Sequence, residues 1–319
     1  MSSLIDAIPR EFFWLFGALI GLLAVASTIG AILIRRPADE KKAASRANLV
    51  ERINAWWVMV AILAVAFLLG ATMTLILFAL ASFFALREFI TLTPSRLGDR
   101  LPLALSFFVI IPAQYVLIGV ERYGTFAIFI PVYAFLLLPS IAALRSDIDD
   151  FLSRSAKQQY GLMVTVYCLS HAPALLMLPL PGGPGRAALL LFYLLLIVQM
   201  SDVMQYVFGK LFGRTKIAPV VSPSKTVEGF VGGGLAATGI GAAMWWITPF
   251  TPLESAGVAA IIVIMGFLGG LTLSAVKRSL GAKDWGVMIE GHGGMLDRTD
   301  SICFAAPIFF HVVRFFFTA

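Results

Sequence analysis

The chain has 319 residues, of which 59% are hydrophobic and only 13% are Asp, Glu, Lys or Arg. Soluble domains are roughly 45–50% apolar and about 25% charged, so a mean hydropathy of +0.90 excludes an ordinary soluble domain. The net charge of +6 is compatible with nucleic-acid binding. However, the cations occupy short loops between apolar segments, which indicates no nucleic-acid partner and a lipid bilayer instead. The composition predicts an all-α, polytopic integral membrane protein.

Ten apolar segments are expected to cross the membrane, because about 18 to 20 apolar residues suffice for a transmembrane helix. In chain order they are 12–34, 54–70, 72–87, 102–120, 124–144, 160–180, 187–208, 229–248, 256–276 and 302–318. The pair at 54–87 is divided only around Gly70, so we predict about nine to ten transmembrane helices.

Lys and Arg residues alternate between the two sides of this arrangement. The loops at 35–53, 87–101, 145–159, 209–228 and 277–301 hold 20 of the 24 Lys and Arg residues. Because cytoplasmic loops of membrane proteins are enriched in basic residues, we expect these five loops to face the cytoplasm and both termini to face outward. This pattern is typical of a bacterial inner (plasma) membrane protein.

The two halves of the chain differ in their polar residues. Residues 1–186 are interpreted as N-terminal scaffold helices, and residues 187–319 as C-terminal helices that carry a cytoplasmic-face site within the same structural domain. In the first half, Asp147, Asp149 and Asp150 form an acidic cluster. No glycine-rich turn lies beside it, so we expect a solvated loop rather than a metal site.

Asp202 lies at the cytoplasmic end of the seventh apolar segment, in "VQMSDVMQYVFGK". An ionisable group near a bilayer is costly unless it is paired or functional. A functional role is therefore the first hypothesis, and a structural partner for Lys225 is the alternative.

The stretch "SPSKTVEG", Ser222 to Gly229, has the features of a helix start. Thr226 or Ser224 is expected to cap the helix. Free N–H groups at a helix start, together with Lys225, suit a phosphate. An ordinary capped helix with a solvated lysine explains this stretch alone equally well.

Residues 277–301 gather both signs of charge between two apolar segments. Asp297 and Asp300 are three residues apart, so a helix places both carboxylates on one face, and Asp284 adds a third. Such carboxylates, with substrate phosphates, suit Mg²⁺. Glycines around His292 allow close backbone approach or positive φ. The cations available for phosphates are Lys277, Arg278, Lys283 and Arg298. The combination indicates phosphoryl or nucleotidyl transfer.

The order S-x-V-K-R-x₄-K-D-x-G-x₅-H-G-G-x₂-D-R-x-D, from Ser274 to Asp300, resembles the defining motif of the phosphatidate cytidylyltransferase family. Residues 206–233 resemble that family's second conserved block. The resemblance implies a multi-spanning enzyme that condenses CTP with phosphatidic acid, requires Mg²⁺, and releases pyrophosphate and CDP-diacylglycerol.

Carried onto this chain, the resemblance implies three groups of site residues. The metal candidates are Asp284, Asp297 and Asp300, with Asp202 second. The catalytic candidates are Asp284, Asp297, Asp300, Lys283 and His292. The substrate-binding candidates are Ser222, Lys225, Thr226, Lys277, Arg278 and Arg298.

Two stretches depart from the family pattern. The family usually has small residues after the aspartate where this chain has Val203, Met204 and Gln205, and Glu290 stands where proline is usual. Bulk beside Asp202 is expected to reshape a substrate pocket, so the lipid acceptor stays open, and a divergent paralogue of the family is one hypothesis for this chain. The oligomeric state also stays open, with a homodimer among the options.

Three alternative functions make different demands on the sequence. A transporter would place polar residues near the bilayer midplane, whereas here they collect at one surface. A CDP-alcohol phosphatidyltransferase needs a D-G-x₂-A-R…G-x₃-D-x₃-D arrangement, which this sequence lacks. The third alternative is the same transfer to a different lipid phosphate.

Overall fold

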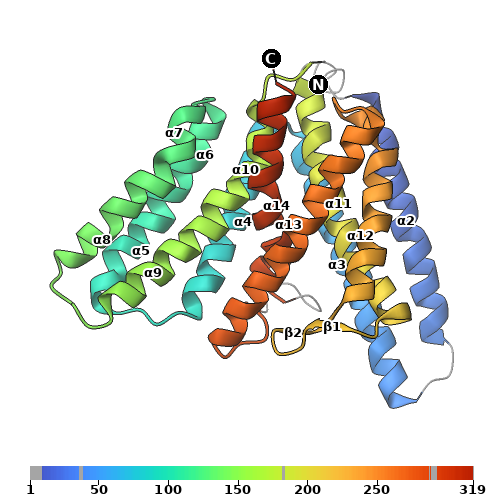
Figure 1. The fold of residues 1–319 in the computed structure, drawn as a ribbon, viewed down its shortest axis with the longest axis horizontal. Helices are drawn as coiled ribbons and strands as arrows, with labels where there is room; N and C mark the ends of the chain where they lie inside the picture. Colours follow the sequence, from blue (N-terminus) through green and yellow to red (C-terminus); the bar gives the residue numbers. More distant parts are fainter. Residues whose placement is uncertain (1–8, 36–38, 182–183, 287, 289–292, 319) are drawn as a thin grey trace.

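The computed structural model describes residues 9–35, 39–181, 184–286, 288 and 293–318, and helices dominate these residues (Figure 1). The helices in chain order are α2 (Arg10–Arg35), α3 (Glu40–Leu68), α4 (Ala71–Thr91), α5 (Arg100–Leu105), α6 (Ile111–Gly119), α7 (Tyr123–Ile128), α8 (Phe135–Ala143), α9 (Phe151–Leu162), α10 (Leu169–Ala174), α11 (Pro184–Phe212), α12 (Val227–Ala243), α13 (Pro252–Ser279) and α14 (Met295–Phe316). Two strands, β1 (Lys216–Ala218) and β2 (Ser222–Thr226), form an antiparallel hairpin.

Short 3₁₀ and π turns extend several helices. They are η1 (Leu97–Asp99), η2 (Ser106–Ile110), η3 (Phe129–Ala134), η4 (Met163–Cys168), η5 (Leu175–Met177) and η6 (Trp245–Ile247). Three of the spans are therefore composite: α5–η2–α6, α7–η3–α8 and α9–η4–α10–η5 each continue as one apolar stretch.

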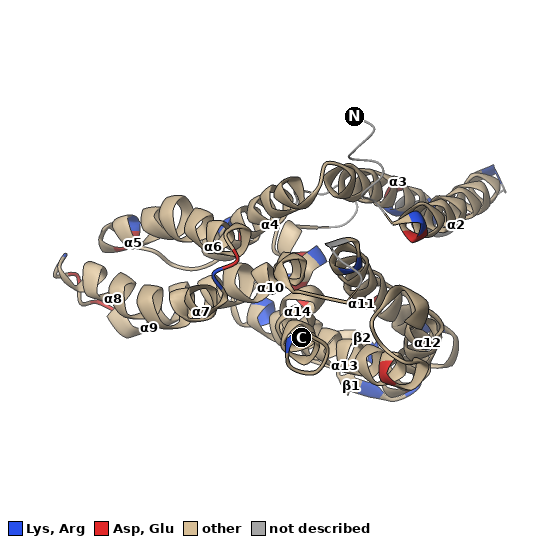
Figure 2. Ribbon diagram, turned by 90° about the horizontal axis from the view of Figure 1, so that it is seen from above, with Lys and Arg blue, Asp and Glu red and all other residues tan. Residues whose placement is uncertain are grey.

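Within the described residues, nine helical stretches are long and apolar enough to cross a membrane. The prediction of an all-α, polytopic membrane protein with about nine to ten such helices is confirmed. The segment expected at 229–248 is helix α12, which has 17 residues. At 1.5 Å per residue it is about 25 Å long, somewhat shorter than the roughly 30 Å hydrocarbon core. Charged residues are sparse along the ribbon (Figure 2).

Helix α14 lies at the centre of the bundle, where it packs against α4, α10, α11 and α13 (Figure 1). Its residues Cys303, Ala306, Phe309 and Phe310 are fully buried. The β1–β2 hairpin lies near the end at which α14 begins, which we call the hairpin end (Figure 1). The end at which α14 finishes and α2 begins is the opposite end. A central helix that starts near the hairpin can present polar side chains to it while its apolar remainder holds the bundle.

Helices α11 and α12 pack backbone against backbone. A Cβ atom on Gly233 would lie 2.3 Å from the backbone nitrogen of Gln205, and one on Gly229 would lie 2.8 Å from its carbonyl oxygen. Any side chain at these glycines would push the helices apart, as at other small-residue contacts between membrane helices. The close approach fixes Asp202, one turn before Gln205, relative to the start of α12.

The acidic cluster between α8 and α9 is paired with arginines. Asp147 accepts hydrogen bonds from Arg96 at 3.2 Å and from Arg154 at 3.3 Å. Arg154 is buried and also lies 3.1 Å from Asp99. Partial desolvation opposes it, but the two guanidiniums lower the pKa of Asp147 below its usual value. The loop is exposed at Asp149 and Asp150, as expected for a solvated loop, and Arg96 and Arg154 form ion pairs with Asp147 and Asp149.

Candidate active site

Thr226 ends strand β2 and caps helix α12. Its Oγ1 accepts a hydrogen bond from the backbone N–H of Gly229 at 3.1 Å, which is the usual role of a threonine at this position. Glu228, in the first turn, accepts hydrogen bonds from the N–H groups of Arg214 at 2.9 Å and Thr215 at 3.1 Å. The predicted cap at Thr226 is confirmed. These contacts fix the hairpin at the start of α12.

Lys225 points from β2 toward helix α13. Its Nζ lies 4.5 Å from the centroid of the Phe267 ring and donates to the Phe267 carbonyl oxygen at 3.4 Å. Burial lowers the pKa of the Lys225 ammonium, and the negative charges of Asp202 and Asp300 oppose that shift. The predicted solvated alternative for Lys225 does not describe this half-buried geometry.

The carboxylates of Asp202 and Asp300 meet beside the hydroxyl of Ser301. Ser301 Oγ lies 3.1 Å from Asp202 Oδ2 and 3.3 Å from Asp300 Oδ1. The hydroxyl has one proton and can donate to only one carboxylate at a time. A Cβ on Gly270 of α13 would lie 3.0 Å from Lys225 Nζ and 3.8 Å from Asp300 Oδ2. This glycine therefore leaves the space in which the lysine and the carboxylates face one another.

A cavity of about 160 Å³ adjoins this cluster. Helix α11, strand β2, helix α12 and helix α13 all contribute to its lining, through Asp202, Gln205, Tyr206, Ser224, Lys225, Thr226, Phe230 and Phe267. Of the three residues that replace the family's small residues after Asp202, Gln205 alone lines the cavity. Its amide nitrogen donates to Ser201 Oγ at 2.7 Å.

A second charged group holds the start of α14. Both oxygens of Asp297 are engaged: Oδ2 accepts from the N–H groups of Trp285 at 2.8 Å and Gly294 at 2.9 Å, and Oδ1 pairs with the Lys277 ammonium. The Lys277 and Asp297 side chains are only 10% and 9% exposed. In this structure Asp297 therefore acts as a cap and a buried ion pair.

Glu88 of α4 completes the same cap. Its carboxylate accepts hydrogen bonds from the N–H groups of Met295 and Leu296, both at 2.8 Å. A Cβ on Gly294 would lie 2.3 Å from Glu88 Oε2, and Gly293 has a φ of 82°. The predicted positive φ is confirmed at Gly293, and the close backbone approach occurs at Gly294, where the neighbouring group is the Glu88 carboxylate.

The other predicted site residues lie around these two groups. The exposed ones are Lys283, Asp284 and Arg278, whose guanidinium donates to the Ala282 carbonyl oxygen at 3.0 Å. Arg298 is half-buried, and Ser222 begins strand β2. His292 and Glu290 lie outside the described residues.

Sequence reasoning missed Glu88, Gly270 and Ser301. The serine follows Asp300 directly in "DRTDS", and a polar residue entering an apolar segment is a usable signal. A glutamate in "FALREFI" at the end of a predicted span was a similar signal. Nothing local in the sequence pairs Glu88 with residues more than 200 positions later.

The donor set fits a magnesium ion. No group of three potential His, Cys, Asp or Glu ligands occurs within the described residues. Mg²⁺, however, is usually held by one or two carboxylates with substrate phosphates and water. Asp202 and Asp300 supply two carboxylates that face the same space.

A polytopic helical membrane protein with two facing carboxylates, a half-buried lysine and a capped helix start has the components of a phosphate-group transfer enzyme. A sequence model of the cytidylyltransferase family matches residues 50–316. The chain belongs to this family and is a nucleotidyltransferase.

Individual relatives extend the comparison. The chain is 38% identical to "Uncharacterized protein YnbB" of Escherichia coli (strain K12) over 301 residues, which are 93% of this chain and 96% of that protein. It is 42% identical over 120 residues to a phosphatidate cytidylyltransferase of Staphylococcus aureus, and 44% over 117 residues to one of Synechocystis sp.. These two matches span 37% and 35% of this chain, and 46% and 39% of the relatives.

Asp297, in the cap of α14, and Asp300, in the carboxylate cluster with Asp202, should respond differently when a neutral asparagine replaces them. Asp297→Asn should lower stability by about 3 kcal/mol, because it leaves the buried Lys277 ammonium unpaired. Asp300→Asn should leave stability unchanged or raise it, because it removes one of two facing negative charges, and it should nearly abolish nucleotidyl transfer.

Thermal unfolding in detergent and turnover of each purified variant measure these effects. Equal destabilisation by the two substitutions would contradict the division into a capping group and a reactive group.

Proposed function

We propose that the protein is a phosphatidate cytidylyltransferase, which makes CDP-diacylglycerol and pyrophosphate from CTP and phosphatidic acid in phospholipid biosynthesis. The observation that carries this proposal is the convergence of Asp202, Lys225 and Asp300 beside one cavity, in a chain of the cytidylyltransferase family. Two relatives that match over part of their length are named phosphatidate cytidylyltransferase, and these names support phosphatidic acid as the acceptor.

In this mechanism an oxygen of the lipid phosphate attacks the α-phosphorus of CTP. A new P–O bond forms while the bond from the α-phosphorus to the bridging oxygen breaks, and pyrophosphate leaves with that oxygen. The nucleophile is already an anion at neutral pH, so no general base is required. Lys225 offsets the negative charge of the transferring group, and its half-buried position strengthens that interaction relative to water.

Asp202 and Asp300 would hold Mg²⁺ together with phosphate oxygens. When bound, the ion neutralises charge that develops on the phosphates and orients them for displacement. Arg278, Lys283 and Arg298 would contact the outer phosphates of CTP. Lys277 is already paired with Asp297, so its proposed role is to hold the start of α14. Roles for Asp284, His292, Ser222 and Thr226 in substrate or metal binding stay predictions.

A different lipid phosphate as acceptor is the second candidate, because Gln205 lines the cavity where the family usually has a small residue. A transporter is less well supported. The facing carboxylates lie near Lys225 of the β1–β2 hairpin rather than in a broken helix at mid-depth, which is the usual place for a transporter site.

The function is tested with purified protein, labelled CTP, Mg²⁺ and a panel of lipid phosphates that includes phosphatidic acid. We expect a CDP-lipid and pyrophosphate in equal amounts, and loss of both products when EDTA removes the divalent cation. Asp300→Asn serves as the inactive control. If a folded protein forms no CDP-lipid from any lipid phosphate in the panel, the proposed function is wrong.

We further propose that the hairpin end faces the cytoplasm of a bacterial inner membrane, where CTP is available. Val220 in the hairpin turn is 89% exposed, and Leu253 at the start of α13 is 84% exposed. A cysteine at Val220 should react with a membrane-impermeant thiol reagent only after the inner membrane is opened. A cysteine at Leu253 should react in intact spheroplasts. The reverse pattern would overturn this orientation.

The acceptor preference should depend on Gln205. Replacing Val203, Met204 and Gln205 with Ser, Gly and Ala should raise activity on phosphatidic acid, because the smaller side chains widen the space beside Asp202. Val203 is 38% exposed and does not line the cavity, so Gln205→Ala alone should give most of the gain, about threefold or more if the side chain restricts the acceptor.

Val203→Ser is the matched control and should leave the rate on phosphatidic acid unchanged. Efficient conversion by the unmodified protein, with no gain from Gln205→Ala, would show that the departure is neutral packing variation.

A further inference from the structure

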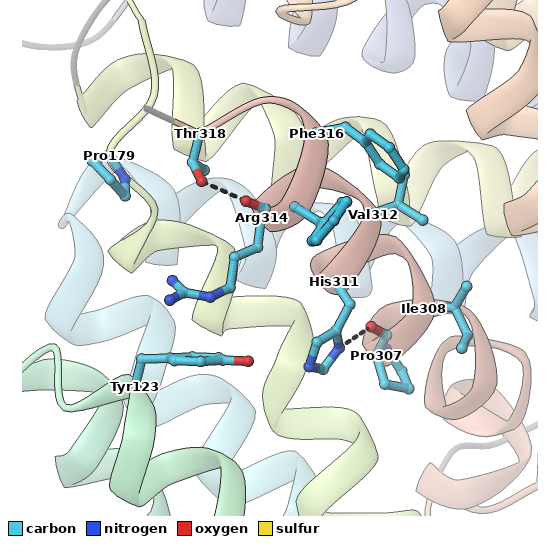
Figure 3. Close-up of a pocket in the computed structure, with 10 residues that line it drawn as sticks. Tyr123, Pro179, Pro307, Ile308, His311, Val312, Arg314, Phe316 and Thr318 are labelled. Atoms are coloured by element: carbon cyan, nitrogen blue, oxygen red, sulfur yellow. Dashed lines mark hydrogen bonds between the residues drawn. The ribbon is translucent and has the colours of Figure 1, made fainter.

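A large open cavity lies at the opposite end of the bundle, away from the candidate active site. Its volume is about 1060 Å³. It lies between the last turns of α14, the start of α7 and Pro179 (Figure 3). Arg314 is 14 residues after Asp300 on α14, so the two lie about 21 Å apart along the helix axis. The cavity is therefore separate from the carboxylate cluster.

Arg314 is held in a fixed position in this cavity. Its guanidinium carbon lies 3.5 Å from the centroid of the Tyr123 ring, and that ring stacks on Phe310 at 6.0 Å. Figure 3 shows the guanidinium over the face of the tyrosine ring, beside the gap toward Pro179. Cation–π contact of this kind orients a guanidinium without neutralising it. Within the described part of the chain, no ion pair joins Arg314 to a carboxylate.

The rest of the lining is mostly apolar and includes exposed side chains. Ile308 is 40% exposed, and Phe315 and Phe316 are 80% and 69% exposed. Tyr123 begins the span Tyr123–Ala143, and tyrosines at the ends of membrane spans are typical of the headgroup level. His311 adds a polar group, although its Nδ1 lies 2.7 Å from the Pro307 carbonyl oxygen and is already engaged. The cavity thus combines one cation at headgroup depth with an apolar wall below it.

We propose that this cavity binds a membrane phospholipid from the leaflet opposite the candidate active site, with its phosphate on Arg314. Charge complementarity selects the phosphate, because the Arg314 guanidinium, in the last turn of α14, forms no ion pair within the described residues and lies at the level of the anionic headgroups. Ile308, Val312 and Phe315 line the path of an acyl chain. The chemistry recognised is a phosphate diester on a diacyl lipid. The proposal does not depend on the identity of the transferase substrate.

Photo-crosslinking tests this site. The probe is a phosphatidylglycerol with a diazirine in its acyl chain, mixed into phosphatidylcholine vesicles that contain the purified full-length protein. Irradiation followed by peptide mapping should label the segment 304–316. Arg314→Gln should reduce that labelling about fivefold, whereas Arg314→Lys should retain at least about half of it, because the charge is kept. Transferase activity should be unchanged in both variants.

Arg10→Gln is the matched control, since Arg10 is exposed at the same end of the bundle, and it should not alter labelling of 304–316. A diazirine diacylglycerol, which lacks the phosphate, should label this segment weakly. Excess inorganic phosphate should not compete, which separates a lipid site from a site for free phosphate. Equal labelling of the unmodified protein and Arg314→Gln, or equal labelling by diacylglycerol, would overturn the proposal and leave Arg314 as an interfacial anchor.

Discussion

The structure depends on one constraint: charged and polar groups at the surface of an apolar helix bundle raise the free energy of the fold unless they are paired or hydrogen-bonded. Helix α14 begins inside this surface, and the N–H groups of its first turn have no partners within the helix. Glu88 and Asp297 supply carboxylates to three of the N–H groups at this start, those of Gly294, Met295 and Leu296. Lys277 then balances Asp297. One structural need, the cap of a central helix, therefore uses two acidic residues and one basic residue.

This cap positions the residues that follow it. Because the first turn of α14 is fixed to α4 and α13, Asp300 and Ser301 have a defined place one turn later. Asp202 approaches from α11, which is held close to α12 by Gly229 and Gly233. Lys225 lies in strand β2 of the hairpin, directly before the start of α12. Helix α11, the hairpin and helix α14 thus bring opposite charges to one cavity, where a low-dielectric setting strengthens electrostatic interactions.

The fold class and most of the spans were predictable from the sequence, because apolar length is a direct requirement of the bilayer. The cap at Thr226 was predictable from local residue preferences, and the positive φ at Gly293 from the glycine-rich turn. The pairing of partners was not. The three-residue spacing of Asp297 and Asp300 correctly suggested a helix, yet their surroundings differ: Asp297 contacts Lys277 and the Trp285 N–H group, whereas Asp300 lies near Lys225 and Asp202. Those neighbours come from tertiary packing, which spacing along one helix does not encode.

The central claim is that Asp202 and Asp300 hold the divalent cation while Asp297 holds the helix. Electron paramagnetic resonance of Mn²⁺ bound in the presence of CTP tests it most directly, because the signal reports the metal and not turnover. The account predicts that Asp202→Asn and Asp300→Asn lose most of this binding, and that folded Asp297→Asn retains it. Retention of Mn²⁺ by Asp202→Asn and Asp300→Asn, with its loss from folded Asp297→Asn, would contradict the account.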